Sequence, residues 1–269
     1  MNKGFKLVKK GELEYLTVPS FEETGLVRHC FTTRLGGVST GEAASLNLSY
    51  KRNDSPENVR ENFRIICEAI GVDHNKIVFS DQTHKKGIYI ATTDDLGKGL
   101  HRESDISDAD GLVTQQKDVP LCTFYADCVP LFFLDPVKKI TSAVHSGWKS
   151  TLLEIGKEAV SVMKDMGSNP DDILAAIGPS IGPCHFEVRG DVAEQFTDKF
   201  GMEILDRTVG DKSFINLWKT NVNILIASGI RERNITLAEE CTYCNRDRFY
   251  SYRGDDHKTG SLCGIIQLV

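Results

Sequence analysis

The sequence lacks any run of apolar residues long enough to cross a bilayer, for which roughly 20 are needed. It also lacks a block of lysine and arginine interleaved with aromatic residues, and its formal net charge is −6. A phosphate backbone requires clustered positive charge, so we expect neither nucleic acid nor a membrane as a partner. A small anionic substrate, which needs only a few local cations, is compatible with this composition.

No internal repeat and no linker rich in Pro, Gly or Ser divides the sequence, and we expect a single domain over residues 1–269. The first residues carry positive charge without a following apolar segment, which does not match a secretory signal and favours a cytoplasmic protein. Thiols stay reduced in that compartment. The eight cysteines are scattered along the chain, so most are expected to be buried free thiols. The sequence does not indicate an oligomeric state.

Four amphipathic segments predict helices. The first begins at Ser55-Pro56 and ends at Gly71; the second is expected after a capping box formed by Thr151 and Glu154, with Ile155 to Met166 as its body. The others are expected over about 191–200 and 216–229. Apolar segments predict strands over 119–134, 140–145, 174–177 and 262–269. This mixture favours an α/β (α+β) fold with layered mixed sheets flanked by helices, and not a regular doubly wound sheet.

The turn at residues 135–139 predicts a hairpin and a specific register. If it is centred between Val137 and Lys138, paired residue numbers sum to 275, so Cys128 faces Gly147. His145 then lies on the same face as Cys128, at a diagonal separation of roughly 7–8 Å. A slip of one residue would put the two side chains on opposite faces.

Three residues stand out as candidate metal ligands by their surroundings. Asp127-Cys128 interrupts an apolar strand, His145 ends the next strand, and His84 follows the apolar run 77–79. Strand ends and loops are common places for binding groups. The spacing matches no short zinc-finger pattern, however, and a lone Cys or His is more often a packed or hydrogen-bonded residue. The residues alone leave both interpretations open.

A series of motifs extends over nearly the whole chain. It comprises Phe31-Thr32-Thr33-Arg34-Leu35-Gly36-Gly37-Val38-Ser39, Ser45-Leu46-Asn47-Leu48, Gln82-Thr83-His84, Ala126-Asp127-Cys128-Val129-Pro130, His145-Ser146-Gly147-Trp148, Gly178-Pro179-Ser180-Ile181-Gly182-Pro183-Cys184 and Tyr252-Arg253. In these motifs the sequence resembles the YfiH/YlmD-type laccase-domain family. That family was first called multicopper polyphenol oxidases and is now described as purine nucleoside phosphorylases.

The resemblance implies a fold akin to the catalytic domain of cytotoxic necrotizing factor. It also implies one Zn²⁺ ion held by His84, Cys128 and His145. The implied substrates are phosphate and purine nucleosides, namely adenosine, inosine, guanosine and methylthioadenosine. The implied reaction is phosphorolysis, with adenosine deamination as a second activity.

Further site residues are expected on the same basis. Arg34, Lys149 and Arg253 are candidates for phosphate binding, and Asn47 for substrate binding. Asp127 is expected to assist catalysis beside Cys128, by proton transfer or by orienting a ligand. A buried structural ion pair is an equal alternative for Asp127.

The sequence departs from the family pattern in ways that thin the expected cationic lining. Lys149-Ser150 stands where Arg-Gly is common after Trp, Gly254 replaces a second Arg, and Ser261 replaces an Arg after Thr-Gly. Cys241 and Cys244 form one CxxC pair. Because a zinc ribbon requires a second pair, we expect these two thiols to be packed or incidental.

Three alternative functions remain. A copper polyphenol oxidase could use the same His₂Cys site, although a multicopper centre needs more histidines and no His-x-His pair exists among the seven. A metal-free cysteine hydrolase would use Cys128 as nucleophile and His145 or His84 as base. A non-enzymatic binding protein with a degenerate site is the third alternative.

Overall fold

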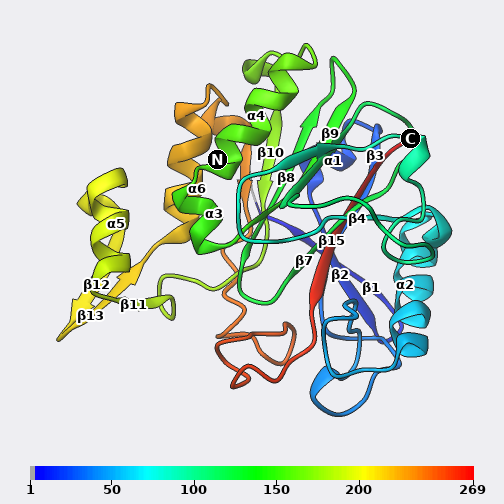
Figure 1. The fold of residues 1–269 in the computed structure, drawn as a ribbon, viewed down its shortest axis with the longest axis horizontal. Helices are drawn as coiled ribbons and strands as arrows, with labels where there is room; N and C mark the ends of the chain where they lie inside the picture. The colour runs from blue at the N-terminus through cyan, green and yellow to red at the C-terminus, as the bar shows by residue number, and fades with distance from the viewer. Residues whose placement is uncertain (1–3) are drawn as a thin grey trace.

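The computed structural model describes residues 4–269, which form two six-stranded sheets packed face to face, with helices on both outer sides (Figure 1). Residues 1–3 of the expected 1–269 domain lie outside the described residues, and the single-domain assignment stays a prediction. The α/β (α+β) layered fold expected from the sequence is confirmed. No helix within residues 4–269 combines the length and apolar character needed to cross a membrane.

The first sheet has the order β1-β2-β3-β15-β7-β4, and the second has the order β14-β10-β8-β9-β6-β5. Strands of the first are β1 (Lys6–Lys10), β2 (Leu13–Thr17), β3 (Val27–Thr32), β15 (Leu262–Leu268), β7 (Leu121–Tyr125) and β4 (Val78–Phe79). Strands of the second are β14 (Ile235–Leu237), β10 (Leu174–Ile177), β8 (Val129–Asp135), β9 (Ile140–Ser146), β6 (Gly111–Thr114) and β5 (Ile88–Ile90). A small sheet of β11 (Glu187–Arg189), β13 (Lys212–Ile215) and β12 (Leu205–Val209) projects to one side (Figure 1).

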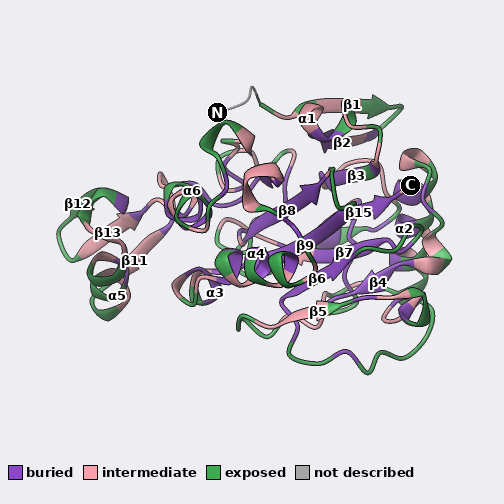
Figure 2. Cartoon of the chain, turned by 90° about the horizontal axis from the view of Figure 1, so that it is seen from above, coloured by how far each residue is buried: buried purple, intermediate pink, exposed green. Residues whose placement is uncertain are grey.

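Residues 4–269 form six α-helices. They are α1 (Pro19–Glu22), α2 (Pro56–Ile70), α3 (Trp148–Leu152), α4 (Ile155–Asp165), α5 (Asp191–Phe200) and α6 (Leu217–Ala227). Helix α2 packs on the outer face of the first sheet, while α4 and α6 pack on that of the second. Between the sheets lies a further core, in which the rings of Phe31 and Phe132 stack with centroids 4.2 Å apart. The central strands are consequently buried on both faces (Figure 2).

Burial on both faces explains the long apolar run in the sequence. On β8, Leu131 and Phe133 face the helices, while Phe132 and Leu134 face the other sheet. The run predicted as one strand over 119–134 is in fact two strands, β7 and β8, in different sheets. The chain passes from one sheet to the other at Asp127-Cys128, and Asp127 takes a positive φ of 83° there.

Most predicted elements are confirmed, including the hairpin register. Val129 pairs with Ser146 and Asp135 with Ile140, so paired numbers sum to 275 as expected. Helix α2 begins after Ser55, whose side chain accepts the Asn58 N–H, and ends at Gly71 with a φ of 73°.

The predicted capping box before α4 is wrong. Thr151 lies inside α3, and its hydroxyl is 2.9 Å from that of Ser146. Glu154 precedes α4 with a φ of 56° and makes no capping bond. The chain turns into a helix directly after β9, so Thr151 contacts the end of that strand instead of capping the next helix.

Candidate metal centre

The structure brings the three candidate ligands together. One ligand atom each of His84, Cys128 and His145 lies within 4.8 Å of the others. His145 is near the end of β9, Cys128 directly precedes β8, and His84 lies in the loop after β4. Because His145 pairs with Pro130, its side chain and that of Cys128 point to the same face, between the two sheets. The hairpin register therefore creates half of the site.

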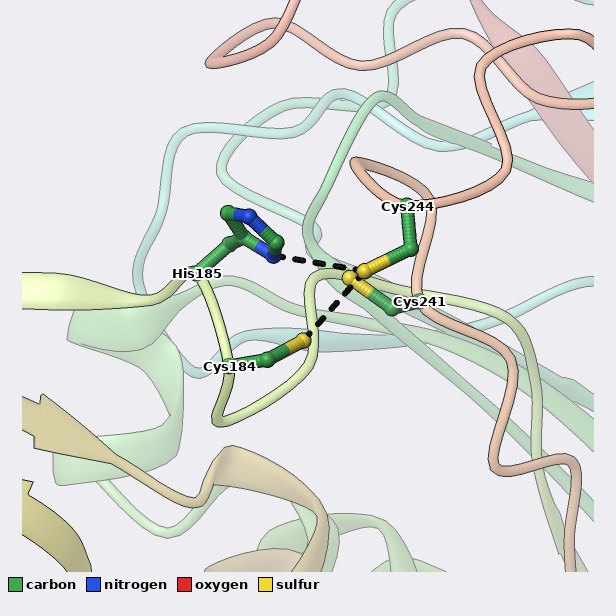
Figure 3. A group of neighbouring side chains, drawn as sticks. All are labelled: Cys184, His185, Cys241 and Cys244. Atoms are coloured by element: carbon green, nitrogen blue, oxygen red, sulfur yellow. Dashed lines mark hydrogen bonds between the residues drawn. The ribbon is translucent and has the colours of Figure 1, made fainter.

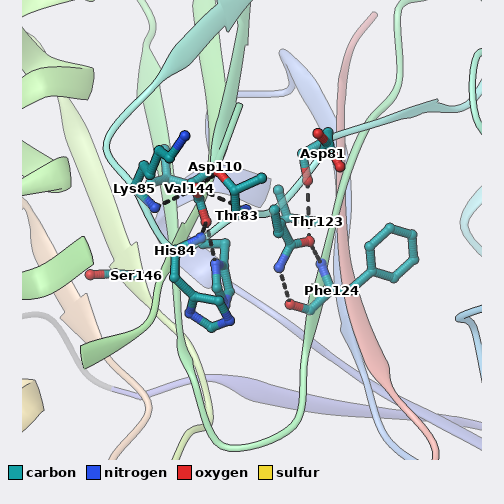
Figure 4. Close-up of polar contacts among 12 residues, drawn as sticks. Asp81, Thr83, His84, Lys85, Asp110, Thr123, Phe124, Val144 and Ser146 are labelled. Atoms are coloured by element: carbon teal, nitrogen blue, oxygen red, sulfur yellow. Dashed lines mark hydrogen bonds and ion pairs between the residues drawn. The ribbon is translucent and has the colours of Figure 1, made fainter. Parts of the chain in front are cut away.

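The buried carboxylate of Asp110 positions the loop that carries His84 (Figure 4). Its fully buried carboxylate accepts hydrogen bonds from three consecutive backbone N–H groups, those of Thr83 (3.1 Å), His84 (3.0 Å) and Lys85 (2.8 Å). Such a concave arrangement of N–H groups suits an anion. It holds His84 at a φ of 59°, a left-handed conformation that a non-glycine residue rarely adopts. The carboxylate thus fixes the turn that directs the His84 imidazole to the site.

The same carboxylate orients His145. Asp110 Oδ1 lies 2.8 Å from His145 Nδ1, so Nε2 is the nitrogen left to face Cys128 and His84. Burial opposes ionisation of Asp110, but hydrogen bonds from His145 and the backbone hold the pKa of Asp110 below its ordinary value. The carboxylate–imidazole pair is the usual support for a metal-ligating histidine.

The two imidazoles differ in their electrostatics. Burial lowers the pKa of His145, but Cys128 and Asp110 outweigh burial and raise it to about 9. Burial lowers the pKa of His84, and the neighbouring His145 adds to this effect. The surroundings therefore favour the charged form of His145 and disfavour that of His84.

Gly147 leaves room for the ligands. A Cβ atom at this position would lie 2.6 Å from His84 Nδ1 and 3.3 Å from Cys128 Sγ. The backbone φ of Gly147 is −63°, which any residue can adopt. Space beside the ligands, and not backbone conformation, is the reason for a glycine here.

The three candidate ligands line a cavity of about 1190 Å³. Tyr252 lines this cavity and is 43% exposed to solvent. The ring of His257 stacks on that of Tyr252 with a centroid separation of 4.4 Å. The side chains of Arg52 and Arg253 supply positive charge to the same cavity. The volume exceeds the roughly 300–1,000 Å³ typical of small-molecule pockets, so it has room for two small substrates together.

Arg52 is a cavity residue that sequence reasoning missed. Its Nε donates to Ser261 Oγ at 2.8 Å, and its guanidinium lies 5.5 Å from the ring centre of Tyr252. Ser261 was expected to thin the cationic lining, yet it accepts a hydrogen bond from an arginine distant in the sequence. No local pattern around Arg52 marks it. Asp110 was missed as well, because its contacts with loop 83–85 and β9 are all made through the fold.

The residues predicted for catalysis and substrate binding, apart from the metal ligands, divide into two groups. Asp127 and Arg253 line the cavity, whereas Arg34, Asn47 and Lys149 are not among the described residues that line it. Arg34 donates to the carbonyl oxygens of Ala44 and Arg246, and the Lys149 ammonium lies 5.4 Å from the Trp148 ring. This geometry lends no support to Arg34 or Lys149 as phosphate ligands.

Asn47 is fully buried outside the cavity. Its amide nitrogen donates to Asp54 and Ser49, and its oxygen accepts the N–H of Ser261. These contacts tie the segment that carries Arg52 to Ser261. Asn47 therefore supports the cavity wall, and its assignment to substrate binding stays a prediction.

Asp127, which directly precedes the candidate ligand Cys128, connects this part of the chain to the C-terminal segment. Its carboxylate accepts bonds of 2.7 Å from the hydroxyls of Thr242 and Ser251 and from the N–H of Arg253. Burial raises the pKa of Asp127, and these donors oppose the rise. Among the described residues Asp127 has no ion-pair partner within 4 Å, so the alternative of a buried salt bridge is not what the geometry shows.

The donor set fits a divalent ion such as zinc. Two imidazoles and one thiol from three separate segments match the ligands zinc uses, and they leave a fourth position open toward the cavity. Asp110 supplies the outer hydrogen bond that such a histidine requires.

Comparison with known proteins identifies the family of the chain. A family model described as multi-copper polyphenol oxidoreductase laccase matches residues 28–269. The chain belongs to this laccase-domain family. The laccase-domain chain is 36% identical over 251 residues to purine nucleoside phosphorylase YlmD of Bacillus subtilis, covering 88% of this chain and 86% of YlmD. It is 31% identical over 257 residues to purine nucleoside phosphorylase YfiH of Escherichia coli, covering 94% and 99%.

Solved structures show the same laccase-domain fold. The hypothetical protein YfiH of Bacillus licheniformis superposes with a TM-score of 0.92 at 31% identity, covering 98% of this chain and 99% of that one. YlmD of Geobacillus stearothermophilus gives a TM-score of 0.89 at 29% identity, covering 97% and 98%. The resemblance inferred from the motifs is thereby confirmed.

Proposed function

We propose that the chain is a zinc-dependent purine nucleoside phosphorylase. The observation that carries the proposal is the convergence of His84, Cys128 and His145 on the wall of a cavity that also holds exposed aromatic and arginine side chains. Relatives that bear the name purine nucleoside phosphorylase and align over most of the chain support it. Adenosine, inosine, guanosine and methylthioadenosine are the proposed nucleosides.

The cavity offers separate surfaces for the two substrates. Tyr252 presents an exposed ring next to that of His257, and a flat purine base can stack on such a surface. Arg52 and Arg253 present guanidinium groups, which suit the oxygens of phosphate. We therefore assign the base to Tyr252 and the phosphate to the two arginines.

In the proposed reaction, a phosphate oxygen attacks C1′ of the ribose as the bond from C1′ to N9 of the purine breaks. The bonding electrons leave with the purine, which takes up a proton. Arg52 and Arg253 hold the phosphate in line and stabilise its charge as the bonds change. A bound zinc ion would supply Lewis-acid stabilisation of negative charge at the same place.

Asp127 acts in this proposal mainly through Arg253. It accepts the Arg253 N–H at 2.7 Å and so places that residue at the cavity. A direct role of Asp127 in proton transfer, a catalytic role of Cys128 and adenosine deamination stay predictions. Conversion of adenosine to inosine in phosphate-free buffer would measure the deamination separately.

The test is the release of hypoxanthine from inosine by purified protein, followed by chromatography with and without phosphate. We expect release that requires phosphate and that is lost in Cys128→Ala and in His84→Ala. Hypoxanthine release independent of phosphate, or none from zinc-loaded protein, would overturn the proposal.

Copper remains the alternative metal. Within residues 4–269, only two groups of three or more close ligand candidates exist, and neither has more than two histidines. A multicopper centre needs more imidazoles than either group offers. Copper-dependent phenol oxidation without phosphorolysis would reverse the assignment.

A metal-free cysteine hydrolase has one specific observation in its favour. Cys128, His145 and Asp110 form a chain of nucleophile, base and orienting carboxylate. That reaction gives no role to His84, whose strained turn aims it at the same point. Alkylation of Cys128 by iodoacetamide that added zinc does not slow would favour the hydrolase.

A further inference from the structure

A second cluster of metal-ligating side chains lies apart from the catalytic residues (Figure 3). It consists of Cys184, His185, Cys241 and Cys244, and one ligand atom of each lies within 4.8 Å of all the others. Cys184 and His185 belong to the segment between β10 and β11, whereas the CxxC pair follows β14. The fold thus supplies the second pair of ligands that the CxxC pair lacks in the sequence.

The distances within the cluster suit one tetrahedral ion. Cys184 Sγ lies 3.5 Å from Cys244 Sγ, and Cys244 Sγ lies 3.3 Å from Nδ1 of His185. With zinc–sulfur bonds of about 2.3 Å and zinc–nitrogen bonds of about 2.0 Å, a tetrahedron separates its ligand atoms by roughly 3.5–3.8 Å. These two separations are within a few tenths of an ångström of that geometry, and none of the others exceeds 4.8 Å. The cysteines are free thiols, so no disulfide competes for them.

The groups around the sulfur atoms are those expected around bound thiolates. The backbone N–H of Gly182 donates to Cys241 Sγ at 3.2 Å. The ring of His185 is held by stacking on Tyr243, with centroids 3.9 Å apart and planes at 16°. Both contacts restrict the direction of a ligand, as hydrogen bonds and packing around a metal site do.

Two arginine side chains lie near the cluster, and one of them, Arg207, also pairs with Asp206 at 2.8 Å. Three thiolates and one Zn²⁺ carry a net charge of −1. Arg207 donates to the carbonyl oxygen of Cys184 at 2.9 Å, and the guanidinium of Arg246 lies 5.3 Å from the Tyr243 ring. A cluster of simple packing cysteines would have no need of cations, and Cys244 is in fact exposed.

We propose that Cys184, His185, Cys241 and Cys244 bind a structural zinc ion. Thiolate and imidazole donors select zinc over the hard cations magnesium and calcium. Four protein ligands complete the tetrahedron and leave no position for a substrate, which is the arrangement of a structural site. The sequence-based expectation that Cys241 and Cys244 are incidental thiols is replaced by this proposal.

The ion would join two segments that form one wall of the cavity. The first segment also carries Ile181 and Phe186, which line the cavity. The second carries Thr242, which donates to Asp127, and Thr242 N–H also bonds to the carbonyl of Ser180 in the first segment. Zinc at this point would hold Asp127 and the wall in place without taking part in the reaction.

The test separates the two metal sites by mutation. In the double variant His84→Ala/His145→Ala, we expect purified protein to retain about one zinc per chain by elemental analysis. Adding Cys184→Ser and Cys244→Ser should remove it. As the matched control, Cys67→Ser is added to the His84→Ala/His145→Ala protein. Cys67 is a buried thiol outside both clusters, so this substitution should leave the zinc content unchanged.

Two further measurements keep the proposal testable if a variant does not fold. In the wild-type background, Cys184→Ser/Cys244→Ser should lower the zinc content by about one per chain, whatever the catalytic site binds. Cobalt added to the metal-depleted His84→Ala/His145→Ala protein should give the strong charge-transfer absorption of several thiolate ligands. A metal chelator should also lower the melting temperature of that double variant.

The proposal would be overturned if the His84→Ala/His145→Ala protein, purified under reducing and zinc-replete conditions, contained no zinc. So would a Cys184–Cys244 disulfide in peptide maps of the non-reduced protein. Loss of phosphorolysis with zinc still bound to the cysteine cluster would refute only the proposed function, because the two sites share no ligand.

Discussion

Replacement of Asp110 by asparagine tests whether one buried carboxylate assembles the metal centre. Asp110 Oδ1 contacts His145 Nδ1 and the His84 N–H, and Oδ2 accepts the N–H groups of Thr83 and Lys85. Every neighbour of both oxygen atoms is a donor. In Asp110→Asn, one oxygen becomes an NH₂ group, which must face donors in either orientation of the amide.

The expected loss can be worked out from these contacts. Removing the partner of a metal-ligating histidine costs 10–100-fold in metal affinity, or about 1.4–2.8 kcal/mol. If the NH₂ group faces His145, the His84 N–H also loses its acceptor; in the other orientation the N–H groups of Thr83 and Lys85 lose theirs, at roughly 1–3 kcal/mol each in stability. We expect Asp110→Asn to bind zinc at least about tenfold more weakly and to unfold at lower denaturant concentration.

The assay is competition for zinc against a chromophoric chelator, on protein shown to be folded by circular dichroism. Asp108→Asn is the matched control. Asp108 is close in sequence, and its exposed side chain forms an ion pair with the Lys85 ammonium at the surface, so its loss should leave zinc affinity unchanged. Folded Asp110→Asn with zinc affinity within threefold of wild type would refute the reasoning.

Three further predictions follow from single contacts. Gly147→Ala should abolish zinc binding, measured by metal analysis, because the new Cβ would lie 2.6 Å from His84 Nδ1. The melting temperature should stay near that of wild type because the backbone at this position tolerates alanine. Full zinc content in this variant would contradict the prediction. Arg52→Ala should raise the KM for phosphate at least about tenfold with a smaller change in kcat, because it removes a charged donor, and Arg52→Lys should recover part of the loss. His29 is buried and accepts the Val18 N–H, and burial lowers the pKa of His29 to about 4. Its contribution to the free energy of unfolding is therefore complete above the unfolded-state pKa near 6.5 and is lost as the pH falls toward 4, so urea titrations should show stability falling by about 2 kcal/mol between pH 7.5 and 5. A His29→Gln variant that keeps the full loss of stability would show the assignment to be wrong.

Much of the site could be anticipated from the sequence because part of it is local. The hairpin turn at 135–139 fixed the pairing of β8 with β9, and a two-residue period then placed Cys128 and His145 on one face. The assignment of these two residues and of His84 as metal ligands came from resemblance to a family and not from spacing. Helix α2 was predictable to the residue because Ser55, Pro56 and Gly71 act through their immediate neighbours.

Residues defined by distant contacts could not be predicted in this way. Asp110 holds loop 83–85, Arg52 bonds to Ser261, and Cys184 meets Cys244 only because segments remote in sequence pack side by side. Arg34 and Lys149 were expected in the cavity as cations, but a side chain's charge does not determine the direction in which the backbone points it.

The sequence by itself determined four of the helices, the pairing of the central hairpin and the family. The tertiary structure alone decided which side chains face the cavity, which carboxylate supports the ligands and which thiols form a second cluster. The physical reason is range: turn, cap and periodicity signals act over a few residues, whereas a metal centre needs donors from several segments at separations of a few ångströms, which only the packing of the two sheets provides.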